Sequence, residues 1–273
     1  MHMRNSKMPK KILKTMTALA ASLVLFGCTS NGEDVAGGGG IIGGSSSGGS
    51  SGGLSNDGST PTNITQGGTP VTGNFICTQG AKAYGNVTTQ VGSNGLVGGL
   101  LTALLNLLGA TTVTQLLNSV SNPDNVIDGN LDTYASVSLT LGLLGGLLDS
   151  VDESVVLPSG ATVPAGKFAV YGLTFPKGAV SLSLLSQVKV ATYLNDSTGT
   201  SKLQESNTLD QNAIALLGTI GGSTPPAVFV GVKTTKAYDR ATVSLTPGLL
   251  SVNVGDAMRI HELCTDGDLV TAP

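Results

Sequence analysis

The chain has few of the side chains on which metal catalysis and sugar stacking commonly depend. It contains no tryptophan, 5 tyrosines, 5 phenylalanines and 2 histidines among 273 residues. Only His261 follows the N-terminal segment, so a histidine-rich metal cluster is excluded. The glycine tract 37–40 has no following lysine and helix, so it is not a phosphate-binding loop. These absences argue against an enzyme.

Charge is equally sparse. Charged residues make up 11% of the chain, and the formal net charge is −3. The folded region has no basic block that would attract the phosphate backbone of a nucleic acid, so nucleic acid is not an expected partner. A chain poor in charge and rich in glycine, serine and threonine fits an exported β protein.

The N-terminus has the pattern of an export signal. Five basic residues lie among the first 14 positions, and the apolar run that follows them ends at Cys28. The sequence Leu25-Phe26-Gly27-Cys28 resembles the bacterial lipobox, whose cysteine is diacylated and becomes the mature N-terminus. The resemblance implies a lipoprotein signal peptide over 1–27, lipidation of Cys28 and, since Thr29 is not aspartate, sorting to the outer membrane. The alternative is an ordinary secretory signal that ends near a cysteine.

A low-complexity stretch follows the acylation site. Residues 28–73 are dominated by glycine, serine and threonine and have too little apolar surface to offset the cost of ordering. The sequence therefore predicts a disordered tether. A flexible coil of about forty residues would hold a domain roughly 35 Å from the membrane.

Residues 74–273 read as an all-β domain. Short β-branched runs alternate with clusters of glycine, proline, asparagine and aspartate, which is typical of a sandwich or barrel. In the first run, Ala135, Val137 and Leu139 alternate with polar residues, so one strand face is apolar. The expected strands are 134–141, 167–175, 186–194, 227–233, 241–245 and 257–263.

A leucine-rich segment, 95–120, interrupts this pattern. Val113, Leu116, Leu117 and Val120 have the spacing of a short helix packed on a core. Polar residues and glycines inside the segment argue against a membrane span, which needs about 20 mostly apolar residues. A further alternative is an apolar rim, formed with the related stretches 139–151, 214–222 and 246–252, that contacts a partner or a membrane.

Three cysteines divide into one lipid carrier and one pair, Cys77 and Cys264. These two bracket the folded region, and an exported compartment is oxidising, so a disulfide is expected. Two separate thiols are the alternative.

The stretch "NPDNVIDGNLDTYASVSL", 122–139, contains the one arrangement of side chains that merits a chemical argument. Asp128, Asn130 and Asp132 alternate and present the oxygen ligands that Ca²⁺ takes. An EF-hand is excluded, because its sixth and twelfth positions would fall on Thr133 and Leu139 rather than glycine and glutamate.

The residues "NVIDGNLDTYAS" resemble a motif of discoidin-type domains, which are galactose-binding-like jelly-roll sandwiches. That family often joins its first and last strands by a disulfide and ends in a strand that carries a glutamate, as "RIHELC" does here. The resemblance implies a jelly-roll fold with a structural calcium held by Asp128, Asn130, Thr133 and Glu262. Glu262 is expected to point inward with Met258, Ile260 and Cys264. The alternative for the motif is a tight Asx turn without metal.

The expected function is lipid-anchored, non-catalytic adhesion or ligand recognition at the cell envelope, with a glycan or a protein as ligand. Tyr84, Tyr134 and Tyr238 are the aromatics expected to be exposed, and Phe168, Tyr171, Phe175, Tyr193 and Phe229 those expected in the core. One alternative is a structural envelope component that assembles through the Leu/Gly-rich segments. The other is a hydrolase, although the acidic run at Asp149, Asp152 and Glu153 reads as a solvated turn.

Overall fold

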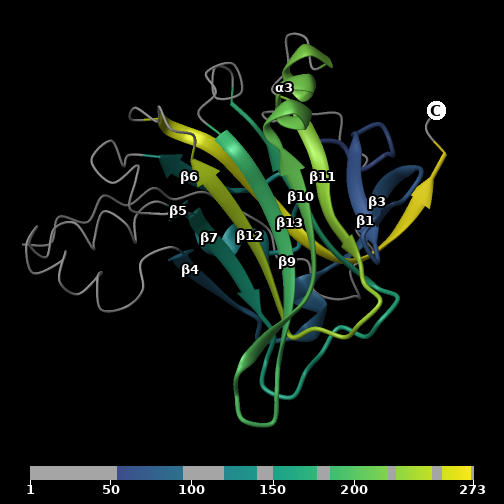
Figure 1. Cartoon of the computed structure of the whole chain (residues 1–273), viewed down its shortest axis with the longest axis vertical. Helices are drawn as coiled ribbons and strands as arrows, with labels where there is room; N and C mark the ends of the chain where they lie inside the picture. Colours follow the sequence, from purple (N-terminus) through teal and green to yellow (C-terminus); the bar gives the residue numbers. More distant parts are fainter. Residues whose placement is uncertain are drawn as a thin grey trace, which may run out of the picture. The chain divides into compact units, whose positions relative to one another are not determined.

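The computed structural model of the chain describes residues 54–94, 120–139, 150–176, 185–220, 226–247 and 254–271. Their strands form two sheets (Figure 1). The eight-stranded sheet contains β1 (Thr62–Gln66), β2 (Thr69–Pro70), β3 (Asn74–Gly80), β5 (Val120–Ser121), β6 (Ala135–Leu139), β8 (Phe168–Thr174), β11 (Ala227–Lys233) and β13 (Val254–Val270). The five-stranded sheet contains β4 (Thr88–Asn94), β7 (Ser150–Val156), β9 (Leu185–Asn195), β10 (Ser201–Asp210) and β12 (Arg240–Pro247).

The connections are those of a jelly roll. From β6 to β13 the chain passes back and forth between the sheets, staying in one sheet only for the β9–β10 hairpin. One sheet has the order β11-β8-β13-β6 and the other the order β10-β9-β12-β7, so each of the last two strands inserts between two earlier ones. Such interleaving is the double Greek key of a jelly roll. The predicted all-β jelly-roll sandwich is confirmed.

The folded region begins earlier than the sequence predicted. Residues 54–73 were assigned to the tether, but β1 pairs in parallel with β11 and buries Ile64 at 2% exposure. Gly67 and Gly68, both at positive φ, make the turn into β2. The strand was missed because "TNITQ" contains a single apolar residue, and only its packing partners distinguish it from the polar stretch before it.

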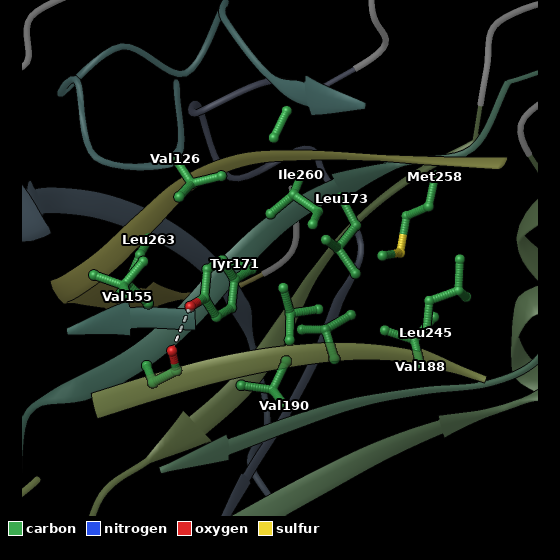
Figure 2. Close-up of a cluster of buried hydrophobic side chains, with 14 of the residues drawn as sticks. Val126, Val155, Tyr171, Leu173, Val188, Val190, Leu245, Met258, Ile260 and Leu263 are labelled. Atoms are coloured by element: carbon green, nitrogen blue, oxygen red, sulfur yellow. Dashed lines mark hydrogen bonds between the residues drawn. The ribbon is translucent and has the colours of Figure 1, made fainter. Parts of the chain in front are cut away.

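The core lies between the two sheets. Figure 2 shows Val188, Val190 and Leu245 of the five-stranded sheet opposite Leu173 and Ile260 of the other. The Tyr171 hydroxyl donates a hydrogen bond to the Ala241 carbonyl at 3.0 Å, which satisfies the polar end of a fully buried ring. The two layers thus share one apolar interior.

A second apolar cluster surrounds the disulfide. Cys77 of β3 and Cys264 of β13 are bonded, as predicted, and both are buried. The ring of Phe75 packs against Phe168 and Phe229 at centroid distances of 5.0 and 5.3 Å. The cross-link therefore closes an aromatic core and joins the beginning of the domain to its last strand.

The six predicted strands are confirmed as β6, β8, β9, β11, β12 and β13, the last of which is much longer than expected. The acidic run is not a turn, because Asp152 and Glu153 lie in β7. Val120, predicted as the end of a helix, pairs with Val137 in β5, and the rest of 95–119 lies outside the described residues. The stretch 214–222 contributes to a helix, α3 (Gln211–Ile220). No helix among the described residues is long and apolar enough to cross a membrane.

Candidate functional site

The predicted metal turn is a hydrogen-bonded Asx turn. The two oxygens of the Asp128 carboxylate accept from the Asn130 backbone N–H at 2.8 Å and from the Thr133 hydroxyl at 2.7 Å. The Asn130 side-chain oxygen accepts from the backbone N–H of Asp132 at 3.0 Å. Gly129, between Asp128 and Asn130, has a φ of 81°, a backbone conformation that favours glycine. Three of the four predicted ligands thus lie together and hold the turn.

The fourth predicted ligand reaches this turn from the last strand. Glu262 Oε2 accepts from the Gly129 backbone N–H at 2.9 Å, and Glu262 Oε1 accepts from the Ala81 N–H at 3.2 Å. Ala81 begins the 3₁₀ helix η1 (Ala81–Tyr84) immediately after β3, and Gly129 precedes β6. Both β3 and β6 pair with β13. The Glu262 carboxyl group therefore links the segment that follows β3 to the segment that precedes β6.

A β-bulge, rather than regular alternation, places Glu262 there. Ile260 pairs with Leu173 and Leu263 pairs with Tyr171, so β13 has one extra residue between these two pairs. Ile260 and Leu263 therefore face the same core, whereas Cys264 belongs to the disulfide cluster. Glu262 is fully buried as expected, but the predicted common face with Met258, Ile260 and Cys264 is wrong.

The environment of Glu262 favours a protonated carboxyl group. Its pKa is raised to about 8. Burial is the largest cause and Asp128 also raises the pKa, while the hydrogen bonds from Gly129 and Ala81 lower it. Lys82 also lowers it, and its ammonium donates to the Asp128 carbonyl at 2.9 Å. A cationic side chain therefore already lies against the turn.

These contacts are those of the metal-free alternative, the Asx turn. Each carboxylate oxygen of Asp128 and Glu262 accepts one hydrogen bond from an N–H or O–H group, which occupies one of its two lone pairs. Lys82 supplies positive charge in the same place. Among the described residues no group of three or more histidine, cysteine, aspartate or glutamate side chains could hold a metal. Calcium stays a prediction of the resemblance, and no step below depends on it.

We expect EGTA to leave the Tm of the full chain unchanged within about 1 °C, because the turn is closed by protein donors. Lys82→Met should lower the Tm, since the Asp128 carbonyl loses its charged donor. Lys236→Met, at an exposed lysine away from the turn, is the matched control. A Tm that falls in EGTA and is restored by added calcium would show that the ion is present.

The outer face of the five-stranded sheet forms a second polar site, which the sequence did not predict. Ala241, Val243 and Leu245 of β12 point into the core, so Arg240, Thr242 and Ser244 point outward. The pairing register aligns each outward residue with one neighbour on β9 and one on β7. The rows are Tyr193-Arg240-Val156, Ala191-Thr242-Ser154 and Lys189-Ser244-Asp152.

Hydroxyl, amide and charged groups cover most of this outer face. The hydroxyls of Ser154 and Thr242 hydrogen bond across the strands at 2.8 Å, and Gln90 of β4 extends their row. The Asp152 carboxylate accepts from the Ser150 hydroxyl at 2.7 Å. These groups are the donors and acceptors that bind hydroxyl-rich ligands.

Tyr193 contributes an aromatic ring to the same outer face. Burial is the largest cause that raises its pKa, Asp152 raises it as well, and Arg240, its neighbour in the same row, lowers it. Tyr193 was predicted in the core but is half-buried on the outer surface. Tyr238 was predicted to be exposed, yet it is fully buried and donates to the Phe168 carbonyl. The aromatic assignments of these two residues were therefore wrong.

Neither of the two acidic groups whose pKa is strongly raised, Glu153 and Glu262, lines a hollow found among the described residues. Glu153 and Glu262 both have a pKa of about 8, but they are only 1% and 0% exposed. Two surface hollows in the described ranges, of about 270 Å³ beside Glu205 and about 500 Å³ beside Lys233, are lined by neither carboxyl group. The second hollow is lined by two other carboxylates, Asp266 and Asp268, the first of which is paired with Lys167.

Comparison with known proteins adds little. No family model and no curated protein matches the chain. The chain is similar to a carbohydrate-binding module specific for non-crystalline cellulose, CBM28, at 8% identity and a TM-score of 0.32, over 55% of this chain and 86% of that one. It is also similar to the enzymatically active domain of bacteriophage CBA120 tailspike protein 4, at 10% identity and a TM-score of 0.22, over 68% and 20%. Likenesses this remote carry no argument about function.

Proposed function

We propose that this chain is a lipid-anchored protein of the cell envelope that uses its jelly-roll sandwich to recognise a glycan, without catalysis. The observation that carries the proposal is the outer face of the five-stranded sheet. There Tyr193 lies beside Arg240, on a surface of serine, threonine and glutamine side chains. One ring, several hydroxyls and fixed charges together match the mixed apolar and polar surface of a sugar.

The sheet gives these groups a fixed spacing. Neighbouring strands lie about 4.8 Å apart, and outward residues repeat about every 6.8 Å along a strand. Because the backbone ladders on both sides of β12 are continuous from Arg240 to Leu245, the side chains are presented on a rigid surface. A rigid binding surface reduces the entropy that association costs.

Glycan binding is expected to depend on Tyr193. A glycan array identifies the best ligand, and titration then measures its affinity. Tyr193→Ala should lower the affinity of the full chain for this ligand about tenfold or more, because the aromatic ring that stacks on a sugar and its hydroxyl group are lost together. Tyr134→Ala is the matched control, since Tyr134 is also half-buried but lies beside β6, where its ring is covered by the Arg259 guanidinium at 4.5 Å.

Two results would count against glycan recognition at this face. Equal losses in Tyr193→Ala and Tyr134→Ala would place the site elsewhere. A blank array together with a stable protein partner captured from membranes would favour the structural envelope component instead.

The membrane anchor is proposed at Cys28, which lies outside the described residues. Multiple acyl chains, each buried methylene contributing about 0.8 kcal/mol, would make the attachment lasting. The tether would then extend from Cys28 to about residue 53, where the described fold begins. Outer-membrane sorting follows from the residue after the cysteine, Thr29.

Cys28→Ser is expected to move the protein from the membrane fraction to the soluble fraction almost completely, because a thioether-linked lipid can no longer form. Detergent phase partitioning and metabolic labelling with a palmitate analogue would measure the change. Wild-type protein that carries no label and partitions into the aqueous phase would contradict the anchor.

A further inference from the structure

A hollow of about 270 Å³ lies where the edges of the two sheets meet. One wall is the edge strand β10, with Glu205 and Ser206, and the other walls come from β1, its turn into β2 and the segment that follows β11. The side-chain amide of Asn207 holds these edges together, because it donates to the carbonyl of Asn63 on β1 at 2.8 Å and to that of Gly231 on β11 at 3.0 Å. The hollow is therefore a fixed feature of the fold.

This hollow borders the outer face that carries Tyr193. Ser206 lines the hollow and also pairs with Ala191, which faces outward on β9. Leu203, 52% exposed, pairs with Tyr193, and a bulge then inserts Gln204 before the next pair. Because paired strands lie about 4.8 Å apart, a ligand on the Tyr193 ring reaches the hollow by crossing a single strand.

The lining of the hollow contains a hydrogen-bonding group that the protein does not use. Thr65 Oγ1 is buried and has no hydrogen-bond partner in the described part of the chain. Buried polar groups nearly always have a partner. The Ser206 hydroxyl and the Gln204 amide belong to the same lining. A ligand rich in hydroxyl groups would supply the partner that Thr65 lacks and would match these neighbours.

Glu205 holds one wall of the hollow in place. Its carboxylate accepts from the Thr235 backbone N–H at 2.7 Å and from the Thr235 hydroxyl at 2.9 Å. These bonds fix the segment after β11 against β10, and a site that is already ordered costs less entropy to fill. The charged residues of the lining are Glu205 and Lys236, so the hollow has no formal net charge.

We infer that the ligand of this face is an oligosaccharide, of which one sugar lies on Tyr193 and a neighbouring sugar enters the hollow beside Glu205. The inference rests on the proposed function and specifies the length of its ligand. The hollow is smaller than the roughly 300–1,000 Å³ of sites for drug-sized molecules, so it admits one sugar ring. Leu203 offers an apolar contact beside Tyr193 where the chain of sugars crosses β10.

The test is a series of ligands of increasing length. Cello-, malto-, xylo- and chito-oligosaccharides of one to six sugars, and fragments of the best ligand from the glycan array, are titrated into the full chain by calorimetry. In at least one series the trisaccharide should bind about tenfold more tightly than the monosaccharide, because contacts in the hollow add to those at Tyr193. Thr65→Val and Gln204→Ala should each lower the affinity for the trisaccharide about fivefold.

Controls separate contact with the ligand from a structural role. Thr65→Val keeps the shape of the side chain and removes an unpaired hydroxyl, so its Tm should not fall while its affinity does. Gln66→Ala changes an exposed residue next to Thr65 that is not part of the lining, and it should bind as the wild type does.

The outcomes distinguish the two proposals. A trisaccharide that binds no more tightly than its monosaccharide, or equally well in Thr65→Val and Gln204→Ala, would overturn the inference and leave glycan recognition at Tyr193 standing. Loss of trisaccharide binding in these two variants but not in Tyr193→Ala would show that the hollow binds alone and would overturn the continuous site. Failure of every series together with a blank array would overturn both proposals.

Discussion

Removal of the disulfide is expected to lower the free energy of unfolding by about 5 kcal/mol in the chain-entropy account. Cys77 and Cys264 are 187 residues apart, so their bond closes a loop that spans almost the whole domain. Without it, the unfolded chain gains the conformational freedom that the cross-link removes. Cys77→Ala with Cys264→Ala, measured by urea unfolding, tests this directly.

Reductant supplies the control for this prediction. Dithiothreitol should lower the stability of the wild type toward that of the double variant and leave the double variant unchanged. Both sulfurs are buried beside Phe75 and Phe168, so reduction in the native state should be slow. Equal stability of wild type and variant under oxidising conditions would show that the native cross-link contributes nothing.

Glu153→Gln is expected to raise the free energy of unfolding at pH 7 by on the order of 3 kcal/mol. Glu153 faces the core between Val151 and Val155, and neither of its carboxyl oxygens has a hydrogen-bond partner. Burial, then Asp124, raises its pKa from 4.5 to about 8. Folding at neutral pH must therefore take up a proton that the unfolded chain has released, and glutamine, of nearly the same shape, removes that cost.

The sign of the pH dependence follows from the same pKa. The folded state holds this proton up to about pH 8, whereas the unfolded state releases it near pH 4.5. The contribution of Glu153 is thus most favourable below pH 4.5, becomes less favourable as pH rises to about 8 and is constant above that. The stability difference between Glu153→Gln and wild type should grow over this range.

Urea unfolding at half-unit steps of pH would measure the stability difference between Glu153→Gln and wild type. The contributions of the other titrating groups cancel in this difference. The groups that face or influence Glu153 are Asp124 before β6 and Tyr171 on β8. Val91 and Val243 flank it on the neighbouring strands. Ser154→Ala, one residue further on the outer face, is the matched control and should show no such pH dependence. A difference that is constant from pH 4.5 to 8 would show that Glu153 is not protonated in the core.

Local patterns sufficed for some elements and failed for others. β6 was predictable because apolar and polar residues alternate over its whole length. β7 was not, because Asp152 and Glu153 stand in its middle, and adjacent acidic residues are usually solvated. Only the neighbouring strands β4 and β12 make that segment a central strand of its sheet.

The site shows the same division. The turn at Asp128 was predictable, because an Asx turn depends on residues close in sequence. The approach of Glu262 to this turn was implied only by the family resemblance. Lys82 donates to the carbonyl of Asp128, which is 46 residues away, and no local sequence pattern predicts this contact. Tyr193 lies in β9 and Tyr238 at an isolated bridge to Val163, and only the tertiary packing decides that the first is half-buried and the second fully buried.

What the sequence by itself determined is the all-β class, the strands with clean alternation, the Cys77–Cys264 pair and the tight turn at 128–133. Each depends on short-range periodicity, on turn residues or on counting. Only the tertiary structure decided the early start of the domain at β1, the bulge that turns Glu262, and the rows of polar groups on the five-stranded sheet. The physical reason is that register and burial are set by partners distant in the chain, and a one-residue shift moves a side chain to the opposite face.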